Sequence, residues 1–322
     1  MSRRALIIGI DNYQFINSLK GCVNDAKQVE SVLQLHANQD EDKNFDVETR
    51  VTMPDRGLTK NFIKDRIEEL FRDKRDISLL YFSGHGHMET TGGFLITSEC
   101  SRGDEGLSMN EILVMANASP AQNRIIILDC CHAGNFGKDS LNQNNVSISE
   151  GVTVLAASAP DQYALEKDGS GVFTSLFIHA MEGGAASILG EITPGNIYGY
   201  IDKAMGEKGQ RPLFMTSVRR YTILRKIASQ IKVKELRQII SLFPEGPNQK
   251  FYLDCTYEPE CNTAIPKHVK KFELLQKYNR VNLVIPKEAT KPNMYHAAIE
   301  NKYCELTPQG KSYWVMVKNN VI

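Results

Sequence analysis

Two short motifs rich in glycine and histidine follow apolar runs of strand length. The first places His85 after Ile77–Phe82, and the second places Cys131 after Ile125–Leu128. An imidazole that takes the proton of a neighbouring thiol produces a thiolate–imidazolium pair, which can attack a carbonyl carbon. Ligands of an open parallel sheet bind beyond the carboxyl ends of its strands. If the two strands are neighbours, the sequence predicts Cys131 as a nucleophile and His85 as its catalytic base.

Glycines surround both of these side chains. Gly84, Gly86 and Gly134 remove side chains from the place where a peptide substrate must approach. The backbone N–H groups of Gly86 and Cys131 are the candidates for an oxyanion hole. Cys130 alternates to the other face of its strand, and we expect it to be a small buried residue.

A zinc site is the alternative for the same motifs. Its candidate ligands are Cys130, Cys131, His132, His85 and His87. Zinc ligand pairs usually have two or more residues between them, whereas adjacent residues at a strand end point in alternate directions. We therefore expect Cys131 and His85 to serve catalysis, the other three residues to be non-catalytic, and the group to hold no metal.

Strand-length apolar runs alternate with helical patterns as far as residue 216. The predicted strands are Ala5–Ile10, Val47–Met53, Ile77–Phe82, Ile125–Leu128 and Val152–Ala156. The predicted helices are Asp25–Leu35, Thr59–Arg72 and Ser108–Ala118, with Thr59 and Ser108 as N-caps. This alternation predicts a doubly wound α/β fold, with a mainly parallel sheet flanked by helices.

The pattern changes after residue 216 and indicates further parts of the chain. We predict a first domain of residues 1–217, a basic and amphipathic helical linker of residues 218–247, and a module of residues 248–322. The module is expected to hold helices around His268–Tyr278 and Asn293–Glu300, a strand around Cys304–Leu306 and a last helix from Thr307 through Trp314. This order suggests a winged-helix-like module, with Leu274, Tyr278, Tyr295 and Trp314 as its core.

Composition limits the classes of function. Lys and Arg together number 38, as do Asp and Glu, so no net charge favours nucleic acid or an anionic membrane. We find no signal peptide and no apolar stretch long enough to span a membrane. Seven scattered cysteines in 322 residues are typical of reduced thiols, which predicts a cytoplasmic location.

The two motifs, Ser83-Gly84-His85-Gly86 and Asp129-Cys130-Cys131-His132-Ala133-Gly134, resemble the paired His and Cys motifs of metacaspases and bacterial caspase-like peptidases. The 46 residues from His85 to Cys131 are close to the roughly 50 that separate this pair in caspases. Further matches occur at Ala5–Gly9, Leu19–Ala26, Val154–Glu166 and Gly171–Thr174. The resemblance covers roughly residues 3–216 and implies a caspase-like fold and a cysteine endopeptidase. The animal caspase signature Q-A-C-x-G is absent.

The resemblance also implies an acidic substrate pocket. In metacaspases, aspartates at the positions of Asp25 and Asp129 line the primary specificity pocket. Two converging carboxylates favour a cation between them, so cleavage after Arg or Lys is expected. On pattern alone, Asp25 would be a helix N-cap or first-turn residue. Lys20 lies near the position of a pocket arginine in animal caspases, so an aspartate-specific protease is the alternative.

The segment after Cys131 is one region from which control of such a protease is expected. Residues 135–150 are predicted to form a surface loop that contains Lys138, and related peptidases carry activation cleavage sites in this region. An uncleaved loop with a solvated lysine is the alternative.

Many metacaspases need calcium, but Asp40-Glu41-Asp42 and Asp104-Glu105 are better explained as solvated loop charges, so no cofactor is assigned.

The C-terminal module predicts either a protein partner or DNA. Basic residues that could contact DNA are Lys267, Lys270, Lys271, Lys277 and Arg280. Acidic residues are interspersed in the module, so we favour a regulatory protein partner. Small fused domains of this kind resemble the adaptor modules of bacterial effector proteases, which suggests a role in defence or programmed cell death.

Overall fold

The computed structural model describes residues 2–38, 42–90, 92–130, 147–157, 166–167, 170–206 and 211–322. The chain forms two compact units, Met1–Ala228 and Ser229–Ile322.

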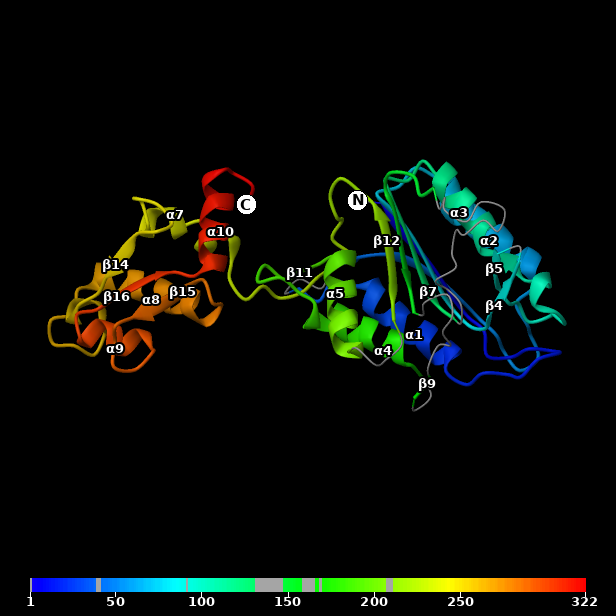
Figure 1. The fold of residues 1–322 in the computed structure, drawn as a ribbon, viewed down its shortest axis with the longest axis horizontal. Helices are drawn as coiled ribbons and strands as arrows, with labels where there is room; N and C mark the ends of the chain where they lie inside the picture. The colour runs from blue at the N-terminus through cyan, green and yellow to red at the C-terminus, as the bar shows by residue number, and fades with distance from the viewer. Residues whose placement is uncertain are drawn as a thin grey trace. The chain divides into compact units, whose positions relative to one another are not determined.

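A six-stranded sheet is the centre of the first unit (Figure 1). Its strands are β1 (Arg3–Gly9), β2 (Asp46–Val51), β3 (Ile77–Ser83), β7 (Asn123–Asp129), β8 (Val152–Ala156) and β12 (Leu213–Ser217). Their order is β12-β8-β7-β3-β1-β2, and every pair is parallel except β12 with β8. All five predicted strands are confirmed. The antiparallel edge strand β12 was not predicted.

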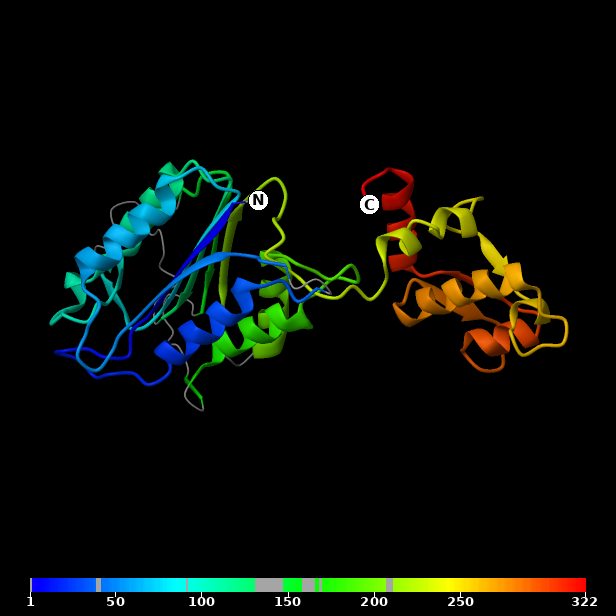
Figure 2. The same ribbon diagram turned by 180° about the vertical axis from the view of Figure 1, so that it is seen from behind.

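Helices cover both faces of this sheet, as a doubly wound fold requires (Figures 1 and 2). On one face α2 (Lys60–Arg72) and α3 (Met109–Ala118) pack on alternate strand residues such as Leu6, Leu80 and Ile126. On the other face α1 (Cys22–Gln34), α4 (Val172–His179) and α5 (Pro194–Met205) pack on Ile7, Leu79 and Ile127. Strand residues are therefore buried on both sides, which explains the continuous apolar runs.

The start of α1 differs from the prediction because a distant carboxylate caps it. Asp11 accepts hydrogen bonds from the backbone N–H groups of Cys22, at 2.8 Å, and Val23, at 3.4 Å. The helix therefore begins three residues before Asp25, which lies in its first turn. The predicted cap of α2 is confirmed, since the Thr59 hydroxyl accepts from Phe62 N.

Three small sheets complete the first unit. One contains β4 (Gly86–Glu89), β5 (Gly92–Leu95) and β6 (Leu107–Ser108), with the short helix η1 (Gly103–Glu105) beside it. The others pair β9 (Glu166–Lys167) with β10 (Ser170–Gly171), and β11 (Glu191–Ile192) with β13 (Arg225–Lys226). A further turn of helix, η3 (Ala180–Gly184), follows α4.

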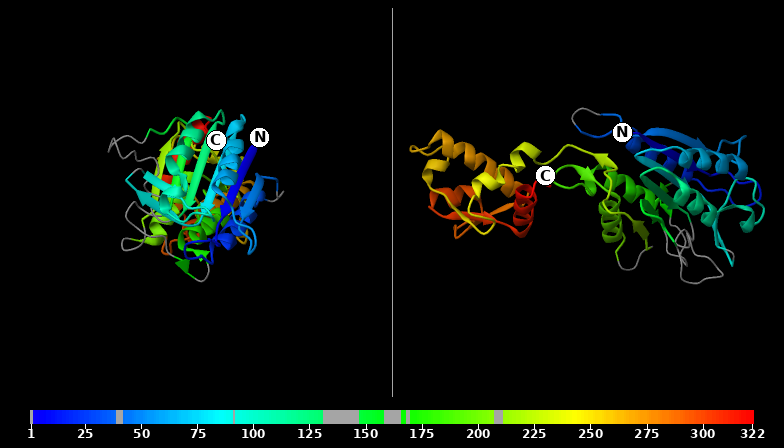
Figure 3. Two further views of the ribbon diagram at one scale, coloured as in Figure 1. Left: turned by 90° about the vertical axis from the view of Figure 1, so that its right-hand side faces the viewer. Right: turned by 90° about the horizontal axis from the view of Figure 1, so that it is seen from above.

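The second unit combines short helices with a three-stranded antiparallel sheet (Figure 3). Its elements are α6 (Val233–Leu236), α7 (Ile239–Leu242), β14 (Lys250–Tyr252), η4 (Cys255–Tyr257), α8 (Pro266–Arg280), β15 (Val284–Lys287), α9 (Met294–Ile299), β16 (Tyr303–Leu306) and α10 (Pro308–Lys318). The predicted helices and strand of this module are present, and Thr307 caps α10 by accepting from Gly310 N at 3.0 Å. The winged-helix assignment stays a prediction.

The predicted linker of residues 218–247 does not form a separate element. Leu224 is buried in the first unit, where the Arg225 side chain donates to the carbonyls of Leu35 and Met181 at 3.1 and 3.0 Å. Leu236 and Ile239 are buried in the second unit, whose Tyr278 hydroxyl donates to the Glu235 carbonyl at 2.7 Å. The first part of this stretch, to Ala228, therefore packs in the first unit, and the part from Ser229 packs in the second.

Two further expectations for the C-terminal part change. Cys255 and Cys261 form a disulfide, so the prediction that all seven cysteines are reduced thiols is wrong for this pair. Tyr295 is 46% exposed and does not belong to the core, whereas Leu274 and Tyr278 are buried. The Trp314 indole donates to the Phe243 carbonyl at 3.0 Å.

No helix among the described residues is long and apolar enough to cross a membrane.

Candidate active site

The predicted catalytic motifs follow β3 and β7 at one edge of the central sheet. The strand register pairs Ser83 with Asp129, so the segments that follow β3 and β7 leave the sheet side by side. His85 comes two residues after Ser83. Cys131 comes two residues after Asp129 and lies outside the described residues, as do His132 and Lys138. The assignment of Cys131 as nucleophile therefore stays a prediction.

The half-buried His85 side chain is oriented by a backbone carbonyl. Its Nε2 atom lies 2.8 Å from the carbonyl oxygen of Asn17. A carbonyl only accepts hydrogen bonds, so this contact assigns the proton to Nε2 and leaves Nδ1 as the basic nitrogen of the neutral ring. The ring is thus held in one orientation and one tautomer.

Tyr13 provides the second support for His85, and sequence reasoning did not identify it. Its hydroxyl accepts the His85 backbone N–H at 2.8 Å, and the two ring centroids are 4.8 Å apart. Burial raises the pKa of the Tyr13 phenol well above its usual value, so the hydroxyl stays protonated. Tyr13 follows β1, which ends beside β3. Its position after an apolar run is the feature of the sequence that could have placed it near His85.

The glycine before His85 makes room for this tyrosine. A Cβ atom at Gly84 would lie 2.8 Å from the Tyr13 hydroxyl oxygen and 2.9 Å from the Phe82 ring. Such distances are below ordinary van der Waals contact. The space that we had assigned to an approaching substrate is therefore occupied by Tyr13.

Gly86 has the backbone orientation that an oxyanion donor needs. The neighbouring pair, His85 and Ile96, is hydrogen-bonded across β4 and β5, with Ile96 N donating to His85 O at 3.0 Å. In an antiparallel ladder the next pair, Gly86 with Leu95, turns its N–H and C=O groups outward. The other predicted donor, Cys131 N–H, lies outside the described residues.

Asp25 and Asp129 meet at the N-terminus of α4. Both are buried, with exposed fractions of 2% and 5%. Asp25 accepts from Gly171 N at 3.1 Å and from the Ser83 hydroxyl at 3.3 Å. Asp129 accepts from the Thr174 hydroxyl at 2.6 Å and from Thr174 N at 3.3 Å. The structure thus brings the two predicted pocket residues together.

Gly171 shows how closely the two carboxylates approach. A Cβ atom at this position would lie 2.2 Å from Asp129 Oδ2 and 3.2 Å from Asp25 Oδ2. Gly171 caps α4, and the positive end of the helix dipole stabilises negative charge there. Hydrogen-bond donors and this helix N-terminus therefore meet both carboxylates at one place.

Two neighbouring groups respond to this negative charge. Burial raises the pKa of the Tyr81 phenol well above its usual value, and the charges of Asp129 and Asp25 raise it further. Burial is also the main cause of the raised pKa of the Cys22 thiol, to which Asp11, Asp129 and Asp25 contribute. Cys22 is therefore held as a thiol and does not act as a second nucleophile.

The remaining residues of the motifs have other roles. Cys130 is buried, as predicted. His87 turns from His85 toward Glu89, with Nε2 to Oε1 at 2.8 Å. Lys20 is exposed, and nothing in the described residues tests the aspartate-specific alternative. A pocket of about 210 Å³ lies against His85 and is also lined by Ile96 and Cys100.

Potential metal ligands do not cluster among the described residues. These residues contain no group of three or more His, Cys, Asp or Glu side chains that could hold an ion. Cys131 and His132, two candidate zinc ligands, lie outside the described residues. So do Asp40 and Glu41, which belong to an acidic segment considered for calcium binding.

Known proteins share this fold and sequence pattern. A caspase-domain family model matches residues 2–243. The protein GSU0716 from Geobacter sulfurreducens has a TM-score of 0.53 and 15% identity, over 70% of this chain and 100% of that one. Caspase-1 from Spodoptera frugiperda has a TM-score of 0.52 and 12% identity, over 70% of this chain and 90% of that one. No curated protein sequence matches.

The family model covers more than half of the chain. The chain therefore belongs to the caspase-domain family and is a cysteine peptidase of the caspase and metacaspase type.

Proposed function

We propose that this cysteine peptidase cleaves peptide bonds after Arg or Lys, with Cys131 as nucleophile and His85 as base. The observation that carries the proposal is the convergence of Asp25 and Asp129 on Gly171, at the sheet edge that also bears His85. An oriented base beside a buried acidic pair suits hydrolysis next to a cationic side chain.

In the proposed first step, the Cys131 thiol gives its proton to His85 Nδ1 and its sulfur attacks the substrate carbonyl carbon. The Asn17 carbonyl stabilises the imidazolium through Nε2–H. Collapse of the tetrahedral intermediate breaks the C–N bond, and the leaving amine takes the proton from His85. Water then hydrolyses the thioester, with His85 accepting its proton, and releases the new carboxylate and the thiol.

The tetrahedral oxygen carries the negative charge of the intermediate. We assign its stabilisation to the outward N–H of Gly86 together with the N–H of Cys131. The Gly86 N–H is supported as a donor because Gly86 follows the hydrogen-bonded His85–Ile96 pair, so its N–H turns away from β5.

The acidic pair accounts for the proposed preference. Ser83, Gly171 and Thr174 donate hydrogen bonds to these two carboxylates, and both carboxylates lie in a buried place. A guanidinium or ammonium group of the substrate offsets their negative charge and forms charge-assisted hydrogen bonds. An aspartate side chain in the same place would be repelled.

Regulation is part of the proposal. Self-cleavage at Lys138 and a regulatory protein partner of the C-terminal module are the proposed controls of an effector protease in the cytoplasm. The module forms its own compact unit, which is consistent with a separate partner site. A nucleic-acid role and a calcium requirement stay open predictions. Adding DNA to the activity assay tests the first, and adding a chelator tests the second.

The direct test uses fluorogenic peptides that end in Arg, Lys or Asp. Wild type should hydrolyse the first two, Cys131→Ala should be inactive, and Cys130→Ala, the matched control, should keep most activity. Activity in Cys131→Ala, or a preference for the Asp peptide, would contradict the proposed nucleophile or the proposed pocket respectively.

A further inference from the structure

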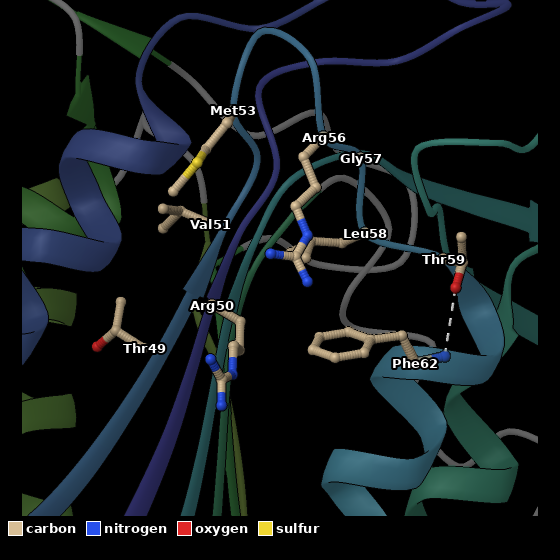
Figure 4. Close-up of a pocket in the computed structure, with 9 residues that line it drawn as sticks. All are labelled: Thr49, Arg50, Val51, Met53, Arg56, Gly57, Leu58, Thr59 and Phe62. Carbon is tan, nitrogen blue, oxygen red and sulfur yellow. Dashed lines mark hydrogen bonds between the residues drawn. The ribbon is translucent and has the colours of Figure 1, made fainter.

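A second pocket, of about 300 Å³, lies between β2 and the start of α2, and none of the candidate catalytic residues lines it (Figure 4). Arg50 reaches it from the strand, and Arg56 reaches it from the turn that follows. The backbone of this turn is fixed by two hydrogen bonds between Met53 and Arg56, at 2.9 and 3.1 Å. Two guanidinium groups thus enter one pocket from defined backbone positions.

The pocket has an excess of positive charge. Among the described residues, no Asp or Glu lines it. Arg56 forms no ion pair with any residue that the structure describes, and Asp55, which precedes it in the turn, does not line the pocket. Arg56 is exposed, so its charge is available to a ligand.

Arg50 is paired, but its pairing does not neutralise the region. Its Nε donates to Glu48 at 2.9 Å, and the same carboxylate also binds Arg4 at 2.7 Å. Arg4 and Arg66 in turn share Glu69, at 3.1 and 2.6 Å. This ion-pair chain contains three guanidinium groups and two carboxylates, so a positive charge remains before Arg56 is counted.

An apolar wall stands opposite the arginines. The Phe62 ring lies 5.9 Å from the Arg50 guanidinium carbon, which holds that side chain in place. Leu58 packs on the same face of the sheet as Phe62, and Met53 lines the pocket from the strand side. Figure 4 shows the Phe62 ring and both guanidinium groups around the same space. Such a site suits a ligand with an anionic group on an apolar body.

The N-terminus of α2 does not supply the anion site. Its first N–H groups already bind the protein's own acceptors, with Lys60 N donating to Glu99 at 2.7 Å and Phe62 N to the Thr59 hydroxyl. The two guanidinium groups therefore carry the attraction. Planar guanidinium groups bind phosphate oxygens with paired hydrogen bonds, and a phosphate monoester carries nearly two negative charges.

We propose that this pocket binds a small phosphate monoester whose apolar or aromatic part packs against Phe62 and Leu58. Its volume is that of a small-molecule site. The site is independent of the proposed peptide hydrolysis, because none of its lining residues belongs to the candidate active site.

The test is titration calorimetry of the full chain with phenyl phosphate. Wild type should bind it saturably and more tightly than inorganic phosphate, because the ring adds apolar contact, and benzyl alcohol should not bind. Arg50→Gln and Arg56→Gln should each weaken binding roughly tenfold or more, since each removes a charge-assisted contact. Affinity should fall as sodium chloride is added.

Arg72→Gln is the matched control, because Arg72 is an exposed arginine in the last turn of α2, away from the pocket. It should bind phenyl phosphate as wild type does. All three arginines are exposed, so the variants should unfold at the wild-type temperature. Absence of saturable binding up to about 10 mM, or equal binding by the Arg50→Gln/Arg56→Gln double variant, would overturn the proposal. Neither result bears on peptide hydrolysis.

Discussion

His85 and the Asp25–Asp129 pair lie at one edge of the same sheet, but the protein holds them in opposite ways. His85 is half-buried and touches neutral partners, the Asn17 carbonyl and the Tyr13 hydroxyl. The two aspartates are buried and meet hydrogen-bond donors at a helix N-terminus. The partners of His85 fix the orientation of one ring at this edge, whereas the donors around the aspartates hold two buried carboxylates close together.

The largest expected effect comes from removing the base. His85→Ala should lower kcat for an Arg peptide by roughly a thousandfold or more, because nucleophile and base act as one unit. His87→Ala is the matched control, since His87 pairs with Glu89, and it should keep most activity. Steady-state kinetics of the two variants would contradict the account if the losses were equal.

Crowding the acidic pair should have the next largest effect. Gly171→Ala places a methyl group 2.2 Å from Asp129 Oδ2, so the carboxylate must move, and kcat/KM for Arg peptides should fall roughly a hundredfold. Gly199→Ala is the control, because a Cβ there meets nothing within 4 Å. Gly199 lies inside α5, so its substitution should leave kinetics unchanged and slightly raise the melting temperature. Equal kinetics for both variants would exclude the steric role of Gly171.

A smaller effect is expected at the neutral support of His85. Tyr13→Phe removes the acceptor of the His85 N–H, and kcat should fall roughly tenfold with little change in KM. Tyr198→Phe serves as control, because its ring stacks on Phe214 away from this edge. A loss confined to KM would indicate that Tyr13 contacts substrate and does not position His85.

The smallest effect concerns stability at high pH. Burial and nearby carboxylates raise the pKa of Cys22 in the folded chain, so above about pH 8.5 unfolding releases a proton and stability falls as pH rises. The stabilising contribution is complete below that pH. Cys22→Ala should flatten this decline by at most about 1.4 kcal/mol per pH unit. Chemical denaturation of both proteins from pH 7.5 to 10 measures the slopes, and parallel slopes would contradict the raised pKa.

Strand-length apolar runs predicted the sheet because its central strands are buried on both faces. The same signal could not show the antiparallel partner of β8, since β12 is only partly buried and does not stand out. The start of α1 was also missed, because Asp11, eleven residues before Cys22, caps it. Contacts between distant residues leave no local pattern in the chain.

The candidate site was predictable where side chains of distinctive chemistry follow strands. His85, Asp25 and Asp129 meet that description. The Asn17 contact uses a backbone carbonyl, which any residue type supplies, so its identity carries no signal. For a related reason, the helical pattern of residues 227–242 does not reveal which unit buries its apolar side.

The central claim is that a buried acidic pair selects a cationic residue before the cleaved bond. The most direct measurement compares kcat/KM for a peptide ending in Arg with that for the same peptide ending in citrulline, which keeps the shape and lacks the charge. Wild type should prefer Arg by roughly a hundredfold or more, and Asp25→Asn and Asp129→Asn should each reduce that ratio at least tenfold. Equal hydrolysis of the two peptides by wild type, or an unchanged ratio in both variants, would contradict the account.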